Sequence, residues 1–169
     1  MRKLLVAFAA LALAACHGPA KPNPAQLTQA NAEAQAFLDK TAKEPGVQKL
    51  PSGLLFKVVR SGEASGMRPQ LGDEVKVNYE GKLASNGKVF DSSYERGQPA
   101  AMPLKGLIPA WQEALPLMRP GDEWILYVPP SLGYGAEGAG DGMIPPNAVL
   151  IFKIELLGVL PGPGRIQNG

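Results

Sequence analysis

The sequence predicts an α+β domain in which an antiparallel sheet wraps around one short helix. Two observations carry this prediction: short β-rich runs, some with a period of two, recur between turn residues, and a single short helical segment lies among them. The 169 residues include 20 glycines and 17 prolines, which favour many turns and short strands over long helices. This length is enough for one domain with a real core, plus appendages.

Residues 1–15 are predicted to be a signal peptide. A basic pair precedes an apolar run over residues 4–14 and then small residues, which is the layout of an export signal. The run is shorter than the roughly 20 residues that a membrane-spanning helix needs. Residues 13–16, Leu-Ala-Ala-Cys, resemble the lipobox of bacterial lipoproteins, which implies that Cys16 carries a lipid that attaches the chain to a membrane. The alternative is an ordinary signal peptide in which Cys16 is an incidental small residue.

The same resemblance indicates a place in the cell envelope. Cys16 is followed by His17 and not by the aspartate associated with retention at the inner membrane, and this favours the outer membrane, with the domain facing the periplasm or the cell surface. Without the signal peptide, 15 basic and 15 acidic residues remain and no basic run is present. A nearly neutral chain without a basic stripe is poorly suited to nucleic acid, so we expect no nucleic-acid partner.

Between the signal peptide and the domain we expect a tether and a helical arm. Residues 16–26 contain three prolines and are predicted to be an extended tether. One helix is predicted over residues 26–43, within an arm at 27–45, because apolar residues recur at three- and four-residue steps before Pro45. This face packs on its own domain or pairs with a second copy, and the periodicity does not decide between them. The recurring positions are Leu27, Ala30, Ala34, Phe37 and Leu38.

Residues 46–160 are predicted to form the domain, followed by a flexible tail at 161–169. A short helix is expected at 109–115, with Pro109 in the first turn, where a missing N–H costs nothing. Asn86-Gly87 is a turn dipeptide that favours a hairpin. The strands are expected at 54–60, 74–79, 82–83, 88–91, 124–128 and 149–157.

The domain lacks most of the residue types that catalytic chemistry uses. The only histidine is His17 and the only cysteine is Cys16, and both precede the domain. This excludes a Ser-His-Asp or Cys-His catalytic group within it and leaves a zinc site with carboxylate ligands alone, which is unusual. No glycine-rich phosphate loop joins a strand to a helix. We therefore expect no metal and no cofactor.

What remains is a set of aromatic residues with polar tips and one carboxylate. Tyr79 and Asp91 end predicted strands, Trp111 lies on the short helix, and Tyr134 lies in a glycine-rich loop. Aromatic residues in a small β domain commonly belong to the core, and an aspartate followed by two serines can simply cap a turn. The alternative is a pocket with Asp91 half-buried at its rim.

Six short motifs resemble those of the FKBP-type peptidyl-prolyl isomerases. Each motif is weak evidence alone, but six in the right order, spanning about residues 53–159, are strong evidence. Residues 31–58 further resemble the bacterial Mip-like branch of that family, whose members often carry a helical arm that mediates dimers. The arm is short here, which argues against a homodimer. The motifs are VNYEG at 77–81, GKVFDSS at 87–93, LIPAW at 107–111, GYG at 133–135, IPPN at 144–147 and LIFKIELL at 150–157.

The resemblance implies a twisted antiparallel sheet half-wrapped around the short helix, with a substrate pocket between them. It implies isomerisation of X–Pro bonds in proline-containing client polypeptides, and macrolide inhibitors as further ligands. Three residues are expected to act in catalysis: Trp111 as the pocket floor, Tyr134 as a donor to a substrate carbonyl, and Asp91 as the one charged group at the rim, paired with Arg96. Ile108 is expected to offer its backbone N–H. The expected substrate-binding residues are Tyr79, Phe90, Met102, Leu107, Ile108, Trp111, Tyr134, Ile144 and Phe152.

Two departures from the family pattern keep an alternative function open. Met102 stands where an aromatic residue is usual, with Ala100 at a second position that is often larger, and the loop between Tyr134 and Pro145 is about one residue longer. Methionine is adaptable, so the pocket wall becomes softer. The alternative is an FKBP-like chaperone that holds proline-containing clients with little turnover. An envelope-tethered structural lipoprotein is a third reading, but it leaves the aromatic cluster and Asp91 without a role.

Overall fold

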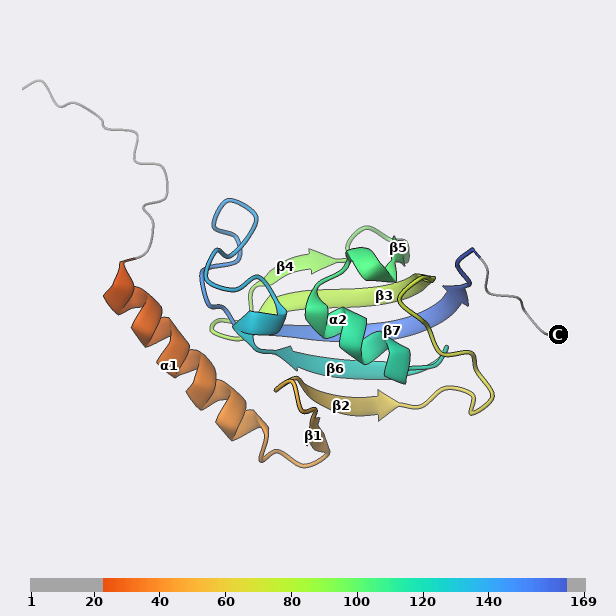
Figure 1. Cartoon of the computed structure of the whole chain (residues 1–169), viewed down its shortest axis with the longest axis horizontal. Coiled ribbons are helices and arrows are strands. Elements are labelled where there is room, and N and C mark those ends of the chain that lie inside the picture. Colours follow the sequence, from red (N-terminus) through yellow and green to blue (C-terminus); the bar gives the residue numbers. More distant parts are fainter. Residues whose placement is uncertain (1–22, 164–169) are drawn as a thin grey trace, which may run out of the picture.

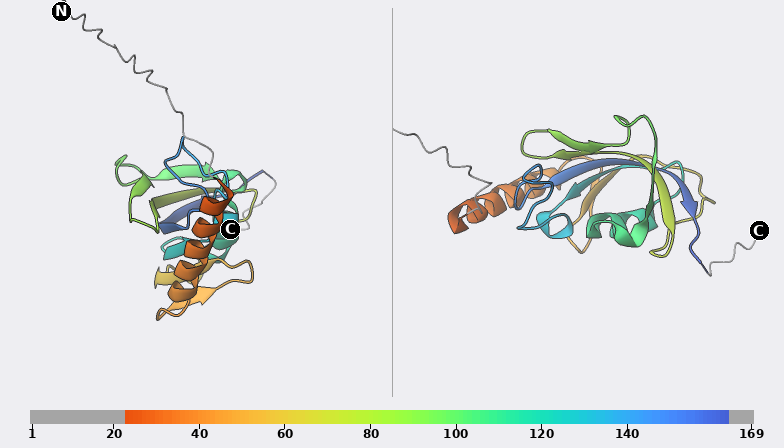
Figure 2. Two further views of the ribbon diagram at one scale, coloured as in Figure 1. Left: turned by 90° about the vertical axis from the view of Figure 1, so that its left-hand side faces the viewer. Right: turned by 90° about the horizontal axis from the view of Figure 1, so that it is seen from above.

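The computed structural model describes residues 23–163, which form one twisted antiparallel sheet of seven strands and a short helix on one face of it. The order is β1-β2-β6-β7-β3-β4, and β5 pairs with the first half of β3. The sheet curves around α2 (Pro109–Ala114), as Figures 1 and 2 show, so the predicted fold is confirmed. The strands are β1 (Val47–Lys49), β2 (Leu55–Arg60), β3 (Glu74–Leu83), β4 (Val89–Ser92), β5 (Ala100–Pro103), β6 (Glu123–Val128) and β7 (Leu150–Leu160).

The predicted signal peptide, Cys16 with its predicted lipid, and residues 164–169 of the predicted tail lie outside the described residues. Of the tail, Gly162 is described, and its N–H donates a hydrogen bond to the Asp73 carboxylate at 2.9 Å. No helix within residues 23–163 combines the length and the apolar character that crossing a membrane requires.

The N-terminal helix is present as α1 (Pro24–Thr41) and begins two residues before its predicted start. Asn23 caps it: the Asn23 side chain accepts a hydrogen bond from the Gln26 N–H at 2.9 Å, and the Gln26 side chain accepts one from the Asn23 N–H at 2.9 Å. Pro24, which we assigned to the tether, occupies the first helical position, where a missing N–H costs nothing. The cap, which apolar periodicity does not report, therefore sets the start of the helix.

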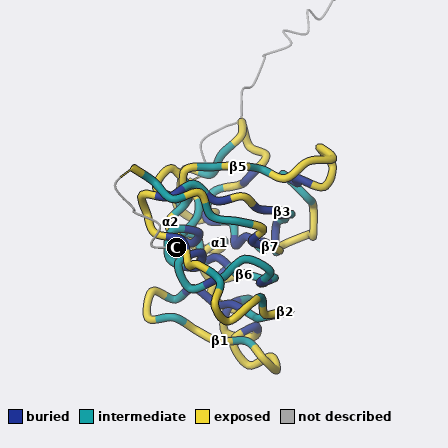
Figure 3. The backbone as a smooth tube through the Cα atoms, turned by 90° about the vertical axis from the view of Figure 1, so that its right-hand side faces the viewer, coloured by how far each residue is buried: buried dark blue, intermediate teal, exposed yellow. Residues whose placement is uncertain are grey.

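The core lies between α2 and the concave face of the sheet. β3 shows why the period of two predicts a strand: Val75, Val77 and Tyr79 are buried in this core, while the residues between them face outward. β3 pairs with β7 along its whole length, from Glu74 opposite Leu160 to Leu83 opposite Leu150. Figure 3 shows the buried backbone positions gathered along these central strands.

α1 lies across one end of the sheet (Figures 1 and 2). Its buried residues Ala34 and Leu38 form a small second cluster with Leu55 and Val149, and Phe37 and Tyr127 border that cluster. Neighbours of these residues along β2 and β6 belong to the main core instead. The helix therefore uses its apolar face on its own domain, which is the first of the two alternatives that the periodicity left open.

Two strands were not predicted, and one predicted turn is confirmed. β1 and β5 are three and four residues long and lie at edges of the sheet, paired with β2 and β3. The β3–β4 hairpin turns at Asn86-Gly87 as expected: Gly87 has a φ of +72°, a conformation that glycine adopts without strain.

Candidate active site

A cavity of about 250 Å³ opens between α2 and the strands β3, β4, β5 and β7. Nine of the ten pocket residues expected from the sequence line it, together with Gly106, which was not expected. The lining residues are Tyr79, Phe90, Asp91, Met102, Gly106, Leu107, Ile108, Trp111, Tyr134 and Phe152.

Aromatic rings meeting edge to face form the base and walls of this cavity. The Trp111 ring lies 5.2 Å from the Tyr79 ring and 5.4 Å from the Phe152 ring, with 87° between the planes in both pairs. Phe90 meets Phe152 in the same way at 5.6 Å. Such pairs are favourable because the positive edge of one ring faces the negative face of the other. Trp111 is only 4% exposed, so it belongs to the core as well as to the cavity.

Gly81 makes room for this arrangement. A Cβ atom at Gly81 would lie 2.7 Å from Cε1 of Phe152 and 2.7 Å from Cζ of Phe90. Non-bonded carbon atoms essentially never lie that close together. Any residue larger than glycine would therefore displace the two rings. The sequence motif contains Gly81, but only the packed structure shows why a side chain is excluded there.

The rim carries one connected polar group. The Tyr79 hydroxyl donates a hydrogen bond to one carboxylate oxygen of Asp91, and the Arg96 guanidinium binds the other. Arg96 also donates to the Tyr79 oxygen at 2.9 Å. The pairing of Asp91 with Arg96 that we expected is thus present, and Tyr79 completes a triangle with them.

This triangle fixes the protonation states at the rim. Burial works against ionisation of Asp91, but the hydrogen bonds from Tyr79 and Arg96 and the charge of Arg96 outweigh it and hold the Asp91 pKa below its usual value. Burial, followed by the hydrogen bond to Asp91, raises the pKa of Tyr79. Burial and the nearby charge of Asp91 raise the pKa of Tyr134 as well. Near neutral pH the site therefore holds one carboxylate and two neutral phenols.

Several hydrogen-bond donors of the lining have no partner within residues 23–163. They include the Tyr134 hydroxyl, the indole N–H of Trp111 and the backbone N–H of Ile108, the residue that precedes α2. The segment before α2 is fastened by Gln112, whose side-chain amide donates to the Leu107 carbonyl at 2.7 Å. Gln112 was not anticipated, because nothing in its sequence neighbourhood marks an amide that bends back to the preceding loop.

Ile144 is the one expected pocket residue that does not line the cavity. It is 6% exposed and belongs to the main core, and its backbone pairs with Ala139 in an isolated bridge. The glycine-rich segment 133–142, which contains Tyr134, precedes Ile144 in the sequence. In the structure that segment is tied to itself and to residues 144–147 by several backbone hydrogen bonds.

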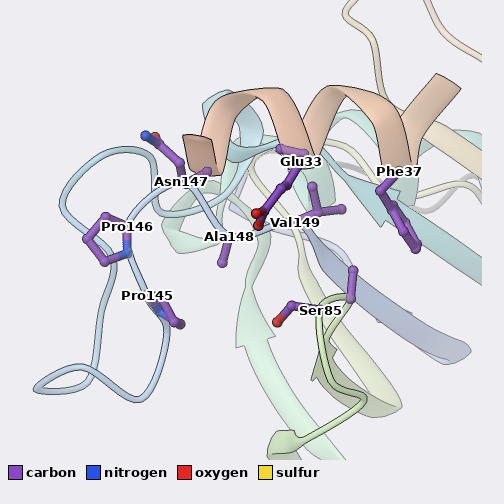
Figure 4. Close-up of a pocket in the computed structure, with 11 residues that line it drawn as sticks. Glu33, Phe37, Ser85, Pro145, Pro146, Asn147, Ala148 and Val149 are labelled. Atoms are coloured by element: carbon purple, nitrogen blue, oxygen red, sulfur yellow. The ribbon is translucent and has the colours of Figure 1, made fainter. Parts of the chain in front are cut away.

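The site offers apolar surface and hydrogen bonds rather than a nucleophile or a metal. No group of three His, Cys, Asp or Glu side chains that could hold a metal ion occurs within residues 23–163. Asp91 is the only carboxylate that lines the cavity, and it is already bound to Tyr79 and Arg96. A larger cavity of about 420 Å³ lies elsewhere, between α1 and residues 145–149 (Figure 4), and Glu33 is the one charged residue among its lining side chains.

Comparison with known proteins agrees with this geometry. Residues 66–157 match the sequence model of the FKBP-type peptidyl-prolyl cis-trans isomerases. The chain belongs to this family. Residues 10–58 match the domain found amino-terminal to such isomerases, as expected from the Mip-like arm.

Individual FKBP proteins are similar over most of this chain. The peptidyl-prolyl cis-trans isomerase Mip of Coxiella burnetii is 55% identical over 130 residues, which cover 76% of this chain and 55% of that protein. The outer membrane protein MIP of Legionella longbeachae is 44% identical over 128 residues, covering 76% of this chain and 53% of that protein. The chain thus spans little more than half the length of these relatives.

Solved FKBP structures share the fold. The crystal structure of FkpA from Escherichia coli superposes with a TM-score of 0.74 at 40% identity, covering 82% of this chain and 65% of that one. The peptidyl-prolyl cis-trans isomerase of Pseudomonas syringae pv. tomato superposes with a TM-score of 0.75 at 36% identity, covering 83% of this chain and the whole of that one.

Proposed function

We propose that this FKBP protein is a peptidyl-prolyl cis-trans isomerase that binds X–Pro segments of unfolded polypeptides in the cavity over Trp111. The observation that carries the proposal is the convergence of Tyr79, Trp111, Phe152 and the free donors of Ile108 and Tyr134 on one cavity. An aromatic cavity of about 250 Å³ is of a size to take a proline ring and the bond before it.

The cavity favours rotation of the amide by taking it out of water. Rotation about the X–Pro bond breaks amide resonance and meets a barrier of roughly 18–20 kcal/mol, so it takes tens to hundreds of seconds unaided. The planar amide is more polar than the twisted one, so water stabilises the planar state more. An apolar site that excludes water therefore raises the ground state relative to the transition state, and no proton needs to move.

Hydrogen bonds supply the orientation that desolvation alone does not. We assign the Tyr134 hydroxyl to a substrate carbonyl on one side of the rotating bond, so that this side is held while the other turns, and the Ile108 N–H to a further carbonyl of the bound segment. Phe90, Met102, Leu107 and Phe152 supply apolar contact. Acceleration by about 10⁵ requires roughly 7 kcal/mol from these effects together.

We assign Asp91 an electrostatic and organising role. Its carboxylate is bound to Tyr79 and Arg96, and its pKa is lowered, so it does not serve as a proton donor or acceptor near neutral pH. It keeps the Tyr79 ring in place against Trp111.

We further infer that the chain is exported and held in the cell envelope by a lipid on Cys16, where it assists the folding of exported proteins. The lipobox-like residues 13–16 support this, as does the relative named as an outer membrane protein. Labelling of cells with a radioactive fatty acid tests the inference. The wild-type chain should carry label and Cys16→Ser should not, and label on the variant would contradict it.

The isomerase proposal is tested with the chain from residue 16 and a chromogenic tetrapeptide that contains a Leu–Pro bond. Tyr134→Phe should lower kcat/KM by about tenfold, since one hydrogen bond to the reacting segment is lost. Tyr94→Phe is the matched control: Tyr94 is 45% exposed against 38% for Tyr134 but does not line the cavity, so its rate should be unchanged. A wild-type chain that prevents client aggregation without turning over the peptide would identify the chaperone alternative instead.

A further inference from the structure

The backbone of Tyr134 and Gly135 makes three hydrogen bonds to other parts of the chain. The Gly135 N–H donates to the Pro130 carbonyl at 2.9 Å, and the Tyr134 carbonyl accepts from the Gly138 N–H at 3.2 Å. The third bond comes from a residue twelve positions later in the chain: the Gly135 carbonyl accepts a hydrogen bond from the Asn147 N–H at 2.8 Å. This last bond joins the peptide unit after Gly135 to the segment leading into β7.

Asn147 donates this bond from an uncommon backbone conformation. Its φ is +56°, and it is one of two non-glycine residues with a positive φ among residues 23–163. Asparagine tolerates this left-handed region because its short side chain can hydrogen-bond locally, whereas most other residues are disfavoured there. The other such residue, Asp141, lies in the exposed turn 140–143. Asn147 is only 9% exposed, so its conformation belongs to the packed part of the fold.

The backbones of the two segments lie in close contact. A Cβ atom at Gly138 would lie 2.3 Å from the Ile144 carbonyl oxygen and 3.0 Å from the carbonyl carbon of Pro145. The backbone of the Tyr134 segment therefore rests directly on residues 144–146. A different backbone conformation at Asn147 would shift residues 144–146, on which this segment rests, and would also shift the hydrogen bond to Gly135.

Asn147 lies next to α1. Two cavities flank this helix, of about 420 and 470 Å³, and Asn147 and Ala34 are the two residues that line both. Figure 4 shows Asn147 close beside the helix, on the stretch of chain that also carries Pro146 and Ala148. Asn147 itself does not line the candidate active site. It therefore touches the arm on one side and the Tyr134 segment on the other.

We propose that Asn147 is a positioning residue for the isomerase reaction: its left-handed backbone directs the N–H that fixes the carbonyl of Gly135, the residue after Tyr134, and thereby helps to place the Tyr134 hydroxyl over the cavity. This inference rests on the proposed function and on the role assigned there to Tyr134. The side-chain amide of Asn147 does not act on the substrate. What matters is that the residue at this position adopts a positive φ.

The test compares Asn147→Gly with Asn147→Ala, in the wild-type chain and in the Tyr134→Phe background, using the Leu–Pro tetrapeptide. Glycine adopts a positive φ freely, so Asn147→Gly should keep kcat/KM within about twofold of wild type. Alanine is disfavoured there, so Asn147→Ala should lower kcat/KM by about three- to tenfold. In the Tyr134→Phe background the alanine substitution should change the rate by less than about twofold, because the hydroxyl that it misplaces is already absent. A purely structural role would give the same loss in both backgrounds.

Thermal unfolding of each variant shows whether it is folded at the assay temperature. If Asn147→Ala is not, Asn147→Gln replaces it as the residue that disfavours a positive φ. Full activity of a folded alanine or glutamine variant would overturn the inference, as would an equal loss in both backgrounds or a loss in Asn147→Gly as large as in Asn147→Ala. An inactive wild type, or a fully active Tyr134→Phe, would instead overturn the proposed function or the role of Tyr134.

Discussion

The Tyr79 hydroxyl donates a hydrogen bond to the Asp91 carboxylate, so the adjacent strands β3 and β4 are joined at the cavity rim by side chains as well as by backbone. A double-mutant cycle measures this link. Tyr79→Phe, Asp91→Asn and the double variant should give a coupling of about 0.5–1.5 kcal/mol in the free energy of urea unfolding. Asp91 is partly exposed, which places the value at the low end. A coupling of zero would show that the bond adds nothing to stability.

The rate of isomerisation should be nearly independent of pH between about 6 and 8. The hydrogen bonds from Tyr79 and Arg96 hold the Asp91 pKa below its usual value, so this group stays ionised throughout that range. Burial raises the pKa values of Tyr79 and Tyr134, so both phenols stay neutral throughout the same range. The profile is measured with one tetrapeptide in buffers of constant ionic strength. A steep step near pH 6.5 would mean that a group absent from this cavity controls the reaction.

Gly81→Ala should lower both stability and activity. The added methyl group meets Phe90 and Phe152 at 2.7 Å, and overpacking of this kind costs about 1–3 kcal/mol. Because both rings line the cavity, kcat/KM of the folded variant should also fall. Gly158→Ala on β7 is the matched control, since a Cβ atom there meets no atom within 4 Å. Equal melting temperatures for the two variants would show that the rings move aside freely.

The contact of α1 with the sheet should contribute less to stability than the main core does. Leu38→Ala should reduce the free energy of unfolding by about 2 kcal/mol, because Leu38 lies in a small cluster that borders solvent. Leu126→Ala, at a fully buried position of the main core, should cost about 3–5 kcal/mol. Urea unfolding of both variants measures the difference. Equal losses would show that the arm is an integral part of the core.

Much of the fold was predictable because one face of each central strand is buried. On β3 this burial is visible in the sequence, because Val75, Val77 and Tyr79 alternate with polar residues. β5 was missed because Ala100-Ala101-Met102-Pro103 has no such pattern, and its partner is the β3 backbone. β1, three residues at the sheet edge, gives equally little signal. The start of α1 was misplaced because the cap formed by Asn23 and Gln26 carries no apolar periodicity.

Site residues that are themselves part of a family motif could be predicted from the sequence. Tyr79, Asp91, Trp111 and Tyr134 stand in family motifs, and all four line the cavity. Ile144 also stands in a motif, but its side chain packs into the core beside the bridge to Ala139. Residues that act through a neighbour in space are harder to find from sequence, because their role depends on what the fold brings beside them. They are Gly81, Gly106, Gln112 and Asn147.

The place of β7 in the sheet has a consequence for the biosynthesis of the protein. β7 is the last strand to be made, yet it lies between β6 and β3. Until residues 150–160 are available, no strand can join β1-β2-β6 to β3-β4-β5. Phe152, on this last strand, also supplies part of the cavity. Completion of the polypeptide therefore precedes closure of the domain, and a chain that ends before residue 150 leaves two sheet edges open to other unfolded chains.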